Sequence, residues 1–261
     1  MYHHVNPGGK FINVRPETFE LHMRYLWDKG FTAVHANEFA DILTGETAAP
    51  QRPVMITFDD GWLDNWVFAF PVLRRYGMKA VIFLITSQIA ERGKMQRSDE
   101  GRVAALPSHE ESKVLIEQGR TDEVMLSWDE VTEMKGSGLI EFHSHTHTHR
   151  RWDKLLPDRG ERNEALRGDL RAARELLERK GLEGSALCWP QGFYDDEYLA
   201  VAGSLGYRMM FTTEAGTNWP GTALKQIKRI VIGDISTFSF AKKLFIYSRP
   251  MLSVVYLRYF K

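Results

Sequence analysis

Short apolar runs alternate with amphipathic segments along most of the chain, and no other feature of the sequence restricts the fold as strongly. The helical spacing of Phe19, Met23 and Leu26 predicts a helix over residues 16–30. Buried strands are predicted for the runs PVMITF (53–58), KAVIFLIT (79–86), LIEF (139–142), SALCW (185–189) and RMMFTT (208–213). Because strands that alternate with helices build parallel sheets, we expect an α/β fold.

Length and charge narrow the class of protein further. The 261 residues are enough for one large α/β domain, which we place at 1–261. A charged, irregular stretch at about 91–124 interrupts the alternation and is interpreted as an insertion at the rim of the sheet. Lys+Arg and Asp+Glu both number 34, so the formal net charge is +0 and no nucleic-acid partner is expected.

The two ends of the chain carry weaker signals. The start, MYHHV, lacks a basic segment followed by an apolar one, so the chain as given is expected to be cytoplasmic, although a truncated N-terminus would also fit. The single cysteine, Cys188, fits a reducing compartment. The apolar tail at about 244–261 is expected to pack on the domain or on a protein partner, with peripheral membrane contact as the alternative.

Polar side chains with metal-binding chemistry follow two of the predicted strands. Asp59 and Asp60 follow PVMITF, and LIEF leads into HSHTHTH, which holds histidines at 143, 145, 147 and 149. The carboxyl ends of parallel strands share one edge of a sheet, so the two clusters can converge there. Histidine and aspartate suit a divalent cation such as zinc. Taken alone, Asp59 and Asp60 are also typical of a turn or a helix cap. The histidine run alone is also typical of a polar strand edge or a surface tract.

Three segments resemble the polysaccharide deacetylases of carbohydrate esterase family four, which share the NodB-homology domain. TFDDG (57–61) is similar to their first motif and HTHTH (145–149) to their second, while YHHV (2–5) resembles the poly-N-acetylglucosamine deacetylase branch. The resemblance implies a distorted (β/α) barrel. It also implies metal-dependent removal of N-acetyl groups from an amino-sugar glycan or glycoconjugate, with one zinc ion or, alternatively, cobalt or nickel.

The resemblance assigns roles to individual residues. Asp60, His145 and His149 become the metal ligands, and Asp59 becomes the general base. An alternative register pairs His143 with His147 at the same spacing and moves the supporting hydroxyl from Thr146 to Ser144. An acidic residue four positions before the first histidine favours the first register, because Glu141 precedes His145 at that distance.

Two departures from the family pattern affect the expected mechanism. In CWPQG (188–192), Cys188 stands where the family has an arginine that orients the base, so an apolar neighbour is expected to raise the pKa of Asp59. Gln191 replaces an aromatic residue, yet its backbone N–H can still stabilise an oxyanion.

The second departure is that no histidine follows His149, so the late histidine that protonates the leaving amine is missing. By resemblance to YHHV, His3 becomes the candidate general acid. His4 is less suitable, because neighbouring residues on a strand face opposite ways. His35 and His109 are the alternatives if the N-terminal segment lies elsewhere.

Two other functions remain compatible with the sequence. One is a related metal hydrolase that acts on a small cyclic amide. The other is a non-catalytic glycan-binding module that retains the metal, which the missing arginine and late histidine would explain.

Overall fold

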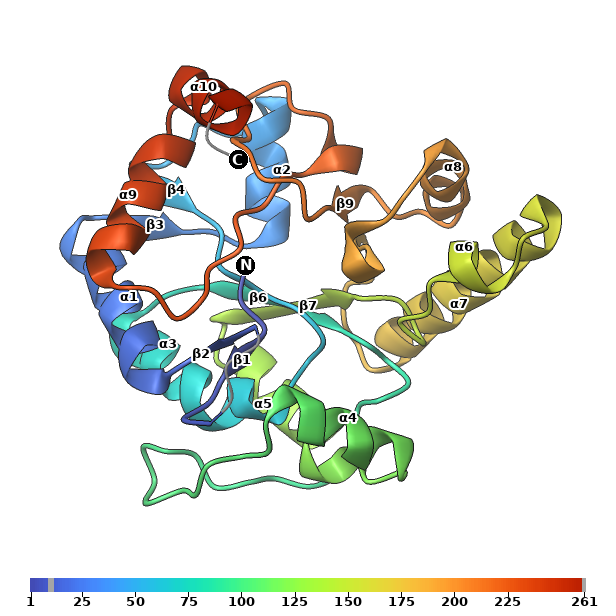
Figure 1. The fold of residues 1–261 in the computed structure, drawn as a ribbon, viewed down its shortest axis with the longest axis horizontal. Helices are drawn as coiled ribbons and strands as arrows, with labels where there is room; N and C mark the ends of the chain where they lie inside the picture. Colours follow the sequence, from blue (N-terminus) through green and yellow to red (C-terminus); the bar gives the residue numbers. More distant parts are fainter. Residues whose placement is uncertain (9–11, 260–261) are drawn as a thin grey trace.

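A curled parallel sheet forms the centre of the molecule (Figure 1). The structure is a computed structural model and describes residues 1–8 and 12–259. In this part of the chain, the sheet has five strands in sequence order: β5 (Thr57–Phe58), β6 (Ala80–Leu84), β7 (Ile140–Ser144), β8 (Ala186–Cys188) and β9 (Met209–Phe211). Every neighbouring pair is parallel. The loops after these strands therefore meet at one edge, which we call the mouth.

Helices cover both faces of the curled sheet. They are α1 (Pro16–Asp28), α2 (Ala36–Thr44), α3 (Phe70–Tyr76), α4 (His109–Glu117), α5 (Trp128–Gly136), α6 (Trp152–Leu155), α7 (Arg159–Arg179), α8 (Asp196–Ser204), α9 (Thr237–Tyr247) and α10 (Pro250–Tyr259). Successive strand residues face opposite sides, so Ile82 packs with α1, α3 and α5 while Phe83 packs with α2 inside the curl. Leu187 joins a third buried cluster with α7 and α8.

Local sequence signals predict the start of α5 correctly, but they do not predict the extent of β5. Ser127 and Glu130 form a capping box at the start of α5, which the spacing Ser-x-x-Glu in the sequence indicates. In contrast, the single strand predicted over residues 53–58 is wrong. Its first part is β4 (Pro53–Val54), which pairs with β3 (Thr32–Ala33), and its second part is β5 of the central sheet. The chain changes partners between the two parts.

The open side of the sheet, between β5 and β9, is bridged by two segments from opposite ends of the sequence. Tyr2 N–H donates to the Thr57 carbonyl at 2.8 Å, and the Met1 nitrogen donates to the Ile230 carbonyl at 2.9 Å. On the other side, Ile227 N–H donates to the Met210 carbonyl at 2.9 Å. These bonds complete a ring of strands, which we call the closed barrel. The expected distorted (β/α) barrel is confirmed.

The remaining short elements lie around this barrel. β1 (His4–Val5) pairs with β2 (Asn13–Val14) just after the bridging segment. A π-helical turn (Asn65–Ala69) precedes α3, and 3-10 turns occupy Thr121–Glu123, Pro190–Gly192 and Leu224–Gln226. The stretch interpreted as a rim insertion contains α4.

The apolar tail at about 244–261 contains the end of α9 and all of α10, which begins at Pro250, and its last residues, 260 and 261, lie outside the described part. Among the described residues, none of the helices combines the length and the hydropathy that crossing a bilayer requires.

Candidate active site

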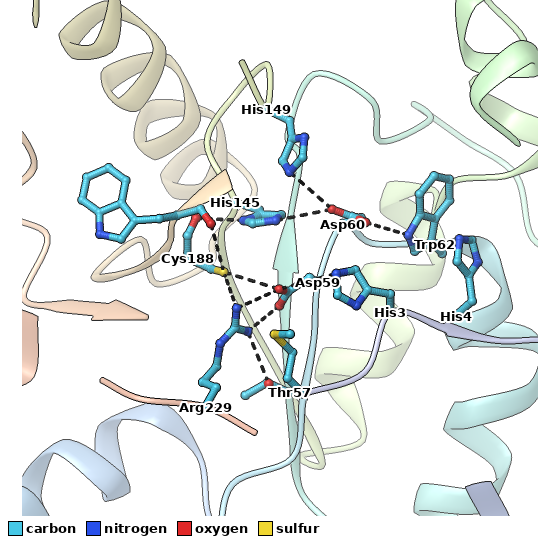
Figure 2. A network of polar contacts seen from close by, with 12 residues as sticks. His3, His4, Thr57, Asp59, Asp60, Trp62, His145, His149, Cys188 and Arg229 are labelled. Atoms are coloured by element: carbon cyan, nitrogen blue, oxygen red, sulfur yellow. Dashed lines mark hydrogen bonds and ion pairs between the residues drawn. The ribbon is translucent and has the colours of Figure 1, made fainter. Parts of the chain in front are cut away.

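The polar residues predicted to converge do meet at the mouth (Figure 2). Asp59 and Asp60 follow β5, His145 follows β7, and Cys188 ends β8. The carboxylate of Asp60 faces both histidines. Its Oδ1 lies 3.4 Å from His145 Nε2 and 3.7 Å from His149 Nε2. Oxygen and nitrogen atoms at these separations form a group that could hold one metal ion.

The hydrogen bonds around His145 fit this use. Its Nδ1–H donates to the backbone carbonyl of Cys188 at 2.8 Å, and this bond orients the ring so that Nε2 faces Asp60. A carbonyl that fixes the tautomer and ring orientation in this way is typical of metal-binding histidines. Burial lowers the pKa of His149 to about 4, so its imidazole is neutral at pH 7 and able to ligate a cation.

A second possible ligand group, made of Asp59, His145 and Cys188, suits a cation less well. The guanidinium of Arg229 lies against it and donates to Asp59 Oδ1 at 2.6 Å, to Oδ2 at 2.8 Å and to the Cys188 sulfur at 3.0 Å. A cation there would meet a buried positive charge. Asp60, His145 and His149 are therefore better suited to hold a cation. We call them the candidate metal group and treat Asp59 separately.

Arg229 also corrects the expectation for Asp59. Burial alone raises the pKa of this carboxyl, but the guanidinium and the imidazole of His145 outweigh burial and hold the pKa well below its ordinary value. Asp59 therefore has a charged neighbour, Arg229, beside the apolar Cys188. The predicted rise in the pKa of Asp59 is wrong. No sequence signal pointed to Arg229, because it belongs to the bridging segment and matches none of the motifs.

The backbone at the mouth adopts uncommon conformations. Asp60, Thr146, His149 and Gln191 have φ values of 77°, 65°, 57° and 54°, in the left-handed region that L-residues with side chains rarely enter. Side-chain hydrogen bonds support the histidine loop: His149 N–H donates to Thr146 Oγ1 at 2.9 Å, and Thr146 N–H donates to Ser144 Oγ at 3.0 Å. Strain of this kind is concentrated at functional sites.

The structure brings His3 to the mouth. Its Nε2 lies 3.9 Å from Asp59 Oδ2 and outside the candidate metal group. Burial lowers the pKa of His3, against the opposing effects of Asp59 and Asp60. His4 points elsewhere and lies 2.5 Å from Asp64. Of the two alternatives, His35 contacts the Leu139 carbonyl, and the ring of His109 contacts His4.

The remaining histidines of the cluster do not join the metal group. His143 is fully buried within the barrel, with Nε2 at 3.2 Å from Glu141 Oε2. His147 Nδ1 lies 2.9 Å from Thr86 Oγ1. The geometry favours the register with His145 and His149. Gln191 follows β8 in a 3-10 turn, and its side-chain oxygen accepts a hydrogen bond from Arg151 at 3.1 Å.

Comparisons with known proteins agree with this fold. The family model described as polysaccharide deacetylase matches residues 46–210. The protein YxkH of Bacillus subtilis (strain 168) is 28% identical over 217 residues, which cover 83% of this chain and 64% of YxkH. The poly-beta-1,6-N-acetyl-D-glucosamine N-deacetylase of Escherichia coli (strain K12) is 24% identical over 254 residues, which cover 86% of this chain and 34% of that protein.

A solved structure has the same fold over nearly its whole length. IcaB from Ammonifex degensii superposes with a TM-score of 0.72 at 24% identity, covering 94% of this chain and 93% of that one. The chain therefore resembles this solved structure along its length but spans less than two thirds of the two curated relatives above. Because the family model matches more than half of the residues and includes both motifs, the chain belongs to the polysaccharide deacetylase family.

Proposed function

We propose that the chain is a metal-dependent hydrolase that removes N-acetyl groups from an amino-sugar glycan. The observation that carries this proposal is the arrangement of the two neighbouring carboxylates. Asp60 faces His145 and His149, whereas Asp59 is held by Arg229 and borders His3. One carboxylate is thus available to a cation and the other to a proton, as amide hydrolysis requires.

The donor set supports zinc, with cobalt or nickel as alternatives. Two imidazoles and one carboxylate, with a further position left for water or substrate, are typical of catalytic zinc sites. A divalent cation bound there would polarise the acetyl carbonyl and lower the pKa of a water molecule.

The protein residues then divide the remaining work. Asp59 accepts the proton of the attacking water, and Arg229 fixes the orientation of its carboxylate. The backbone N–H of Gln191 donates to the developing oxyanion. His3 lies 3.9 Å from Asp59, so the proton has a short route to the leaving amine through the imidazole.

The substrate proposed is a polymer of N-acetylglucosamine. Its support is the name of the Escherichia coli relative, which is a poly-beta-1,6-N-acetyl-D-glucosamine N-deacetylase. A family resemblance alone leaves the linkage open, so the test compares several glycans. The same comparison includes a cyclic amide, because a related hydrolase of that class is the first alternative function.

The experiment measures acetate released from N-acetylglucosamine oligomers of several linkages, by protein freed of metal with a chelator and reloaded with zinc, cobalt or nickel. We expect no release without metal and release after reloading. Hydrolysis of the cyclic amide alone would replace the proposal with the first alternative. Metal binding and glycan binding without release from any substrate would favour the non-catalytic module.

We also propose that the surface formed by α9 and α10 contacts an anionic membrane. Large apolar side chains are exposed on these helices, namely Phe238, Phe245, Met251, Leu252, Val254, Val255 and Tyr259. The charged residues from position 235 onward are all basic: Lys242, Lys243, Arg249, Arg258 and Lys261. Apolar side chains combined with basic ones suit the interface of an anionic bilayer.

Vesicle sedimentation tests this surface. We expect the protein to sediment with vesicles containing phosphatidylglycerol, less so with purely zwitterionic vesicles, and less at high salt. Met251→Glu should reduce binding, because Met251 is 84% exposed, whereas Trp27→Glu, at a 60% exposed position on α1, serves as the control. Equal sedimentation of the two variants, or none by the unaltered protein, contradicts membrane contact and leaves a protein partner or no partner for this surface.

A further inference from the structure

Trp62 follows Asp60 by two residues and contacts the side chain of this candidate metal ligand. Its indole N–H donates to Asp60 Oδ2 at 2.9 Å. The other oxygen, Oδ1, is the one that faces His145 and His149. The two oxygens of one carboxylate thus have separate partners, and the indole holds the oxygen that lies farther from the imidazoles (Figure 2).

The indole is itself held in place by residues from two other parts of the chain. The His4 ring is stacked on Trp62, with centroids 4.3 Å apart, and the His109 ring meets it edge-on at 5.5 Å. His4 is fixed in turn, because its Nδ1–H donates to Asp64 Oδ2 at 2.5 Å. Asp64 Oδ1 accepts a bond from the backbone of Val5 at 3.1 Å. His4, which the proposed mechanism does not use, therefore has a place in this arrangement.

Comparison with Trp66 separates this contact from ordinary core packing. Both tryptophans are buried, at 3% and 0% exposure, and both belong to the same apolar cluster. The Trp66 indole N–H donates to the backbone carbonyl of Met95. Trp62 differs in that its acceptor is the side chain of a candidate metal ligand. A purely structural tryptophan needs an acceptor but does not need this one.

We propose that Trp62 is a positioning residue for Asp60. Its N–H occupies Oδ2, so that Oδ1 alone is presented to a cation, and the Asp64–His4 pair keeps the indole in that orientation. Groups that hold a ligating carboxylate in this way typically change metal affinity about 10-fold to 100-fold when they are removed. The inference rests on the proposed metal site and deepens it.

The test measures the affinity of metal-free protein for Zn²⁺ and Co²⁺ by competition with a chromogenic chelator. Trp62→Phe keeps an aromatic ring and removes the N–H, so affinity is expected to fall by about 10-fold to 100-fold. The visible spectrum of bound Co²⁺ is expected to change as well, because Oδ2 becomes free to bind. Trp66→Phe is the matched control and is expected to retain the affinity and spectrum of the unaltered protein.

A second pair of variants covers the case in which Trp62→Phe fails to fold. His4→Leu and His4→Phe both leave Asp64 without its imidazole partner, but only His4→Leu removes the ring that stacks on Trp62, so a difference in affinity between the two variants reports this stacking. His4→Phe restores a ring that can stack on the indole, and it should recover affinity.

The possible outcomes distinguish the positioning role of Trp62 from the existence of the proposed metal site. If Trp62→Phe binds as tightly as Trp66→Phe, or if the two His4 variants are equal, the positioning role is wrong while the metal site stands. If the unaltered protein binds neither cation, the proposed metal site fails and this inference fails with it.

Discussion

Asp59 and Asp60 are adjacent and chemically identical, yet their surroundings give them different properties. The φ of Asp60 is 77°, and the two side chains reach different partners. Asp59 forms a two-point ion pair with Arg229, whereas Asp60 faces two imidazoles and an indole. At the scale of single residues, function therefore depends on backbone conformation as much as on residue type.

Replacing the proposed base tests this division. Asp59→Asn keeps the size of the side chain but cannot accept a proton from water. We expect acetate release to fall by about 100-fold to 10,000-fold, which is the usual contribution of a general base, while bound metal measured by elemental analysis stays the same. Loss of the metal from Asp59→Asn would instead assign Asp59 to the metal group.

Removing Arg229 is expected to damage both stability and activity. The Arg229 and Asp59 side chains are only 4% and 3% exposed, so Arg229→Met leaves a buried carboxylate without its partner. Breaking such a pair costs about 3–5 kcal/mol, to be measured by urea unfolding at neutral pH. Arg75→Met is the control, because the Arg75–Glu20 pair is 56% and 38% exposed and should contribute little.

Arg229→Met is also expected to change how stability and rate depend on pH. The folded-state pKa of Asp59 lies below its ordinary value, so the stabilisation by this group is complete above the ordinary pKa and declines as the pH falls below it. In Arg229→Met the main effect opposing burial is gone, and the pKa of Asp59 rises. The acid limb of the rate profile should therefore move to higher pH. An unchanged acid limb would show that Asp59 does not control it.

His3→Ala tests the proposed acid. The imidazole lies 3.9 Å from Asp59 and outside the candidate metal group, so turnover should fall while metal content is retained. The loss should be smaller for substrates whose leaving group needs no proton. If His4→Ala behaves this way and His3→Ala does not, the assignment within YHHV is wrong.

At the scale of elements, the sequence predicts those features that depend on local pattern. The strand–helix alternation, the capping box at Ser127 and the position of both motifs at strand ends are of this kind. Arg229 could not be predicted, because its contact with Asp59 depends on which segment completes the barrel. The partner change between β4 and β5 is equally a tertiary effect, since residues 53–58 form one apolar run.

The turn after β8 leaves no room for a side chain at Gly192. Gly192 has φ 71°, and an added Cβ would lie 2.0 Å from Thr213 Oγ1 and 2.7 Å from Thr213 Cβ. Gly192→Ala should therefore destabilise the fold and displace Gln191, with loss of acetate release.

Gly181→Ala is the matched control for this turn. Gly181 has φ 69°, but an added Cβ would come no closer than 3.9 Å to its nearest neighbour outside the adjoining residues, Lys135 Nζ. Only the left-handed strain of about 1–2 kcal/mol applies there. Equal unfolding free energies for the two variants would mean that the turn after β8 accommodates the added methyl group without loss of stability.

At the scale of the whole molecule, the proposed site combines segments that are far apart in the sequence. The metal group comes from the loops after β5 and β7, which belong to the central sheet. His3 and Arg229 come from the two segments that bridge its open side. Family membership and the convergence of the candidate metal group could be predicted from the sequence. The contact between the two bridging segments could not, because they contain no periodic pattern.

The closed barrel has a consequence for the order in which the protein folds. The bond between Met1 and Ile230 joins residues 229 positions apart, and the Asp59–Arg229 pair joins residues 170 apart. Contacts between such distant residues form slowly, because a long loop must close before they stabilise anything. Refolding protein is therefore expected to regain the Co²⁺ spectrum before it regains acetate release. For a short time, each molecule would hold its metal in a barrel that is still open.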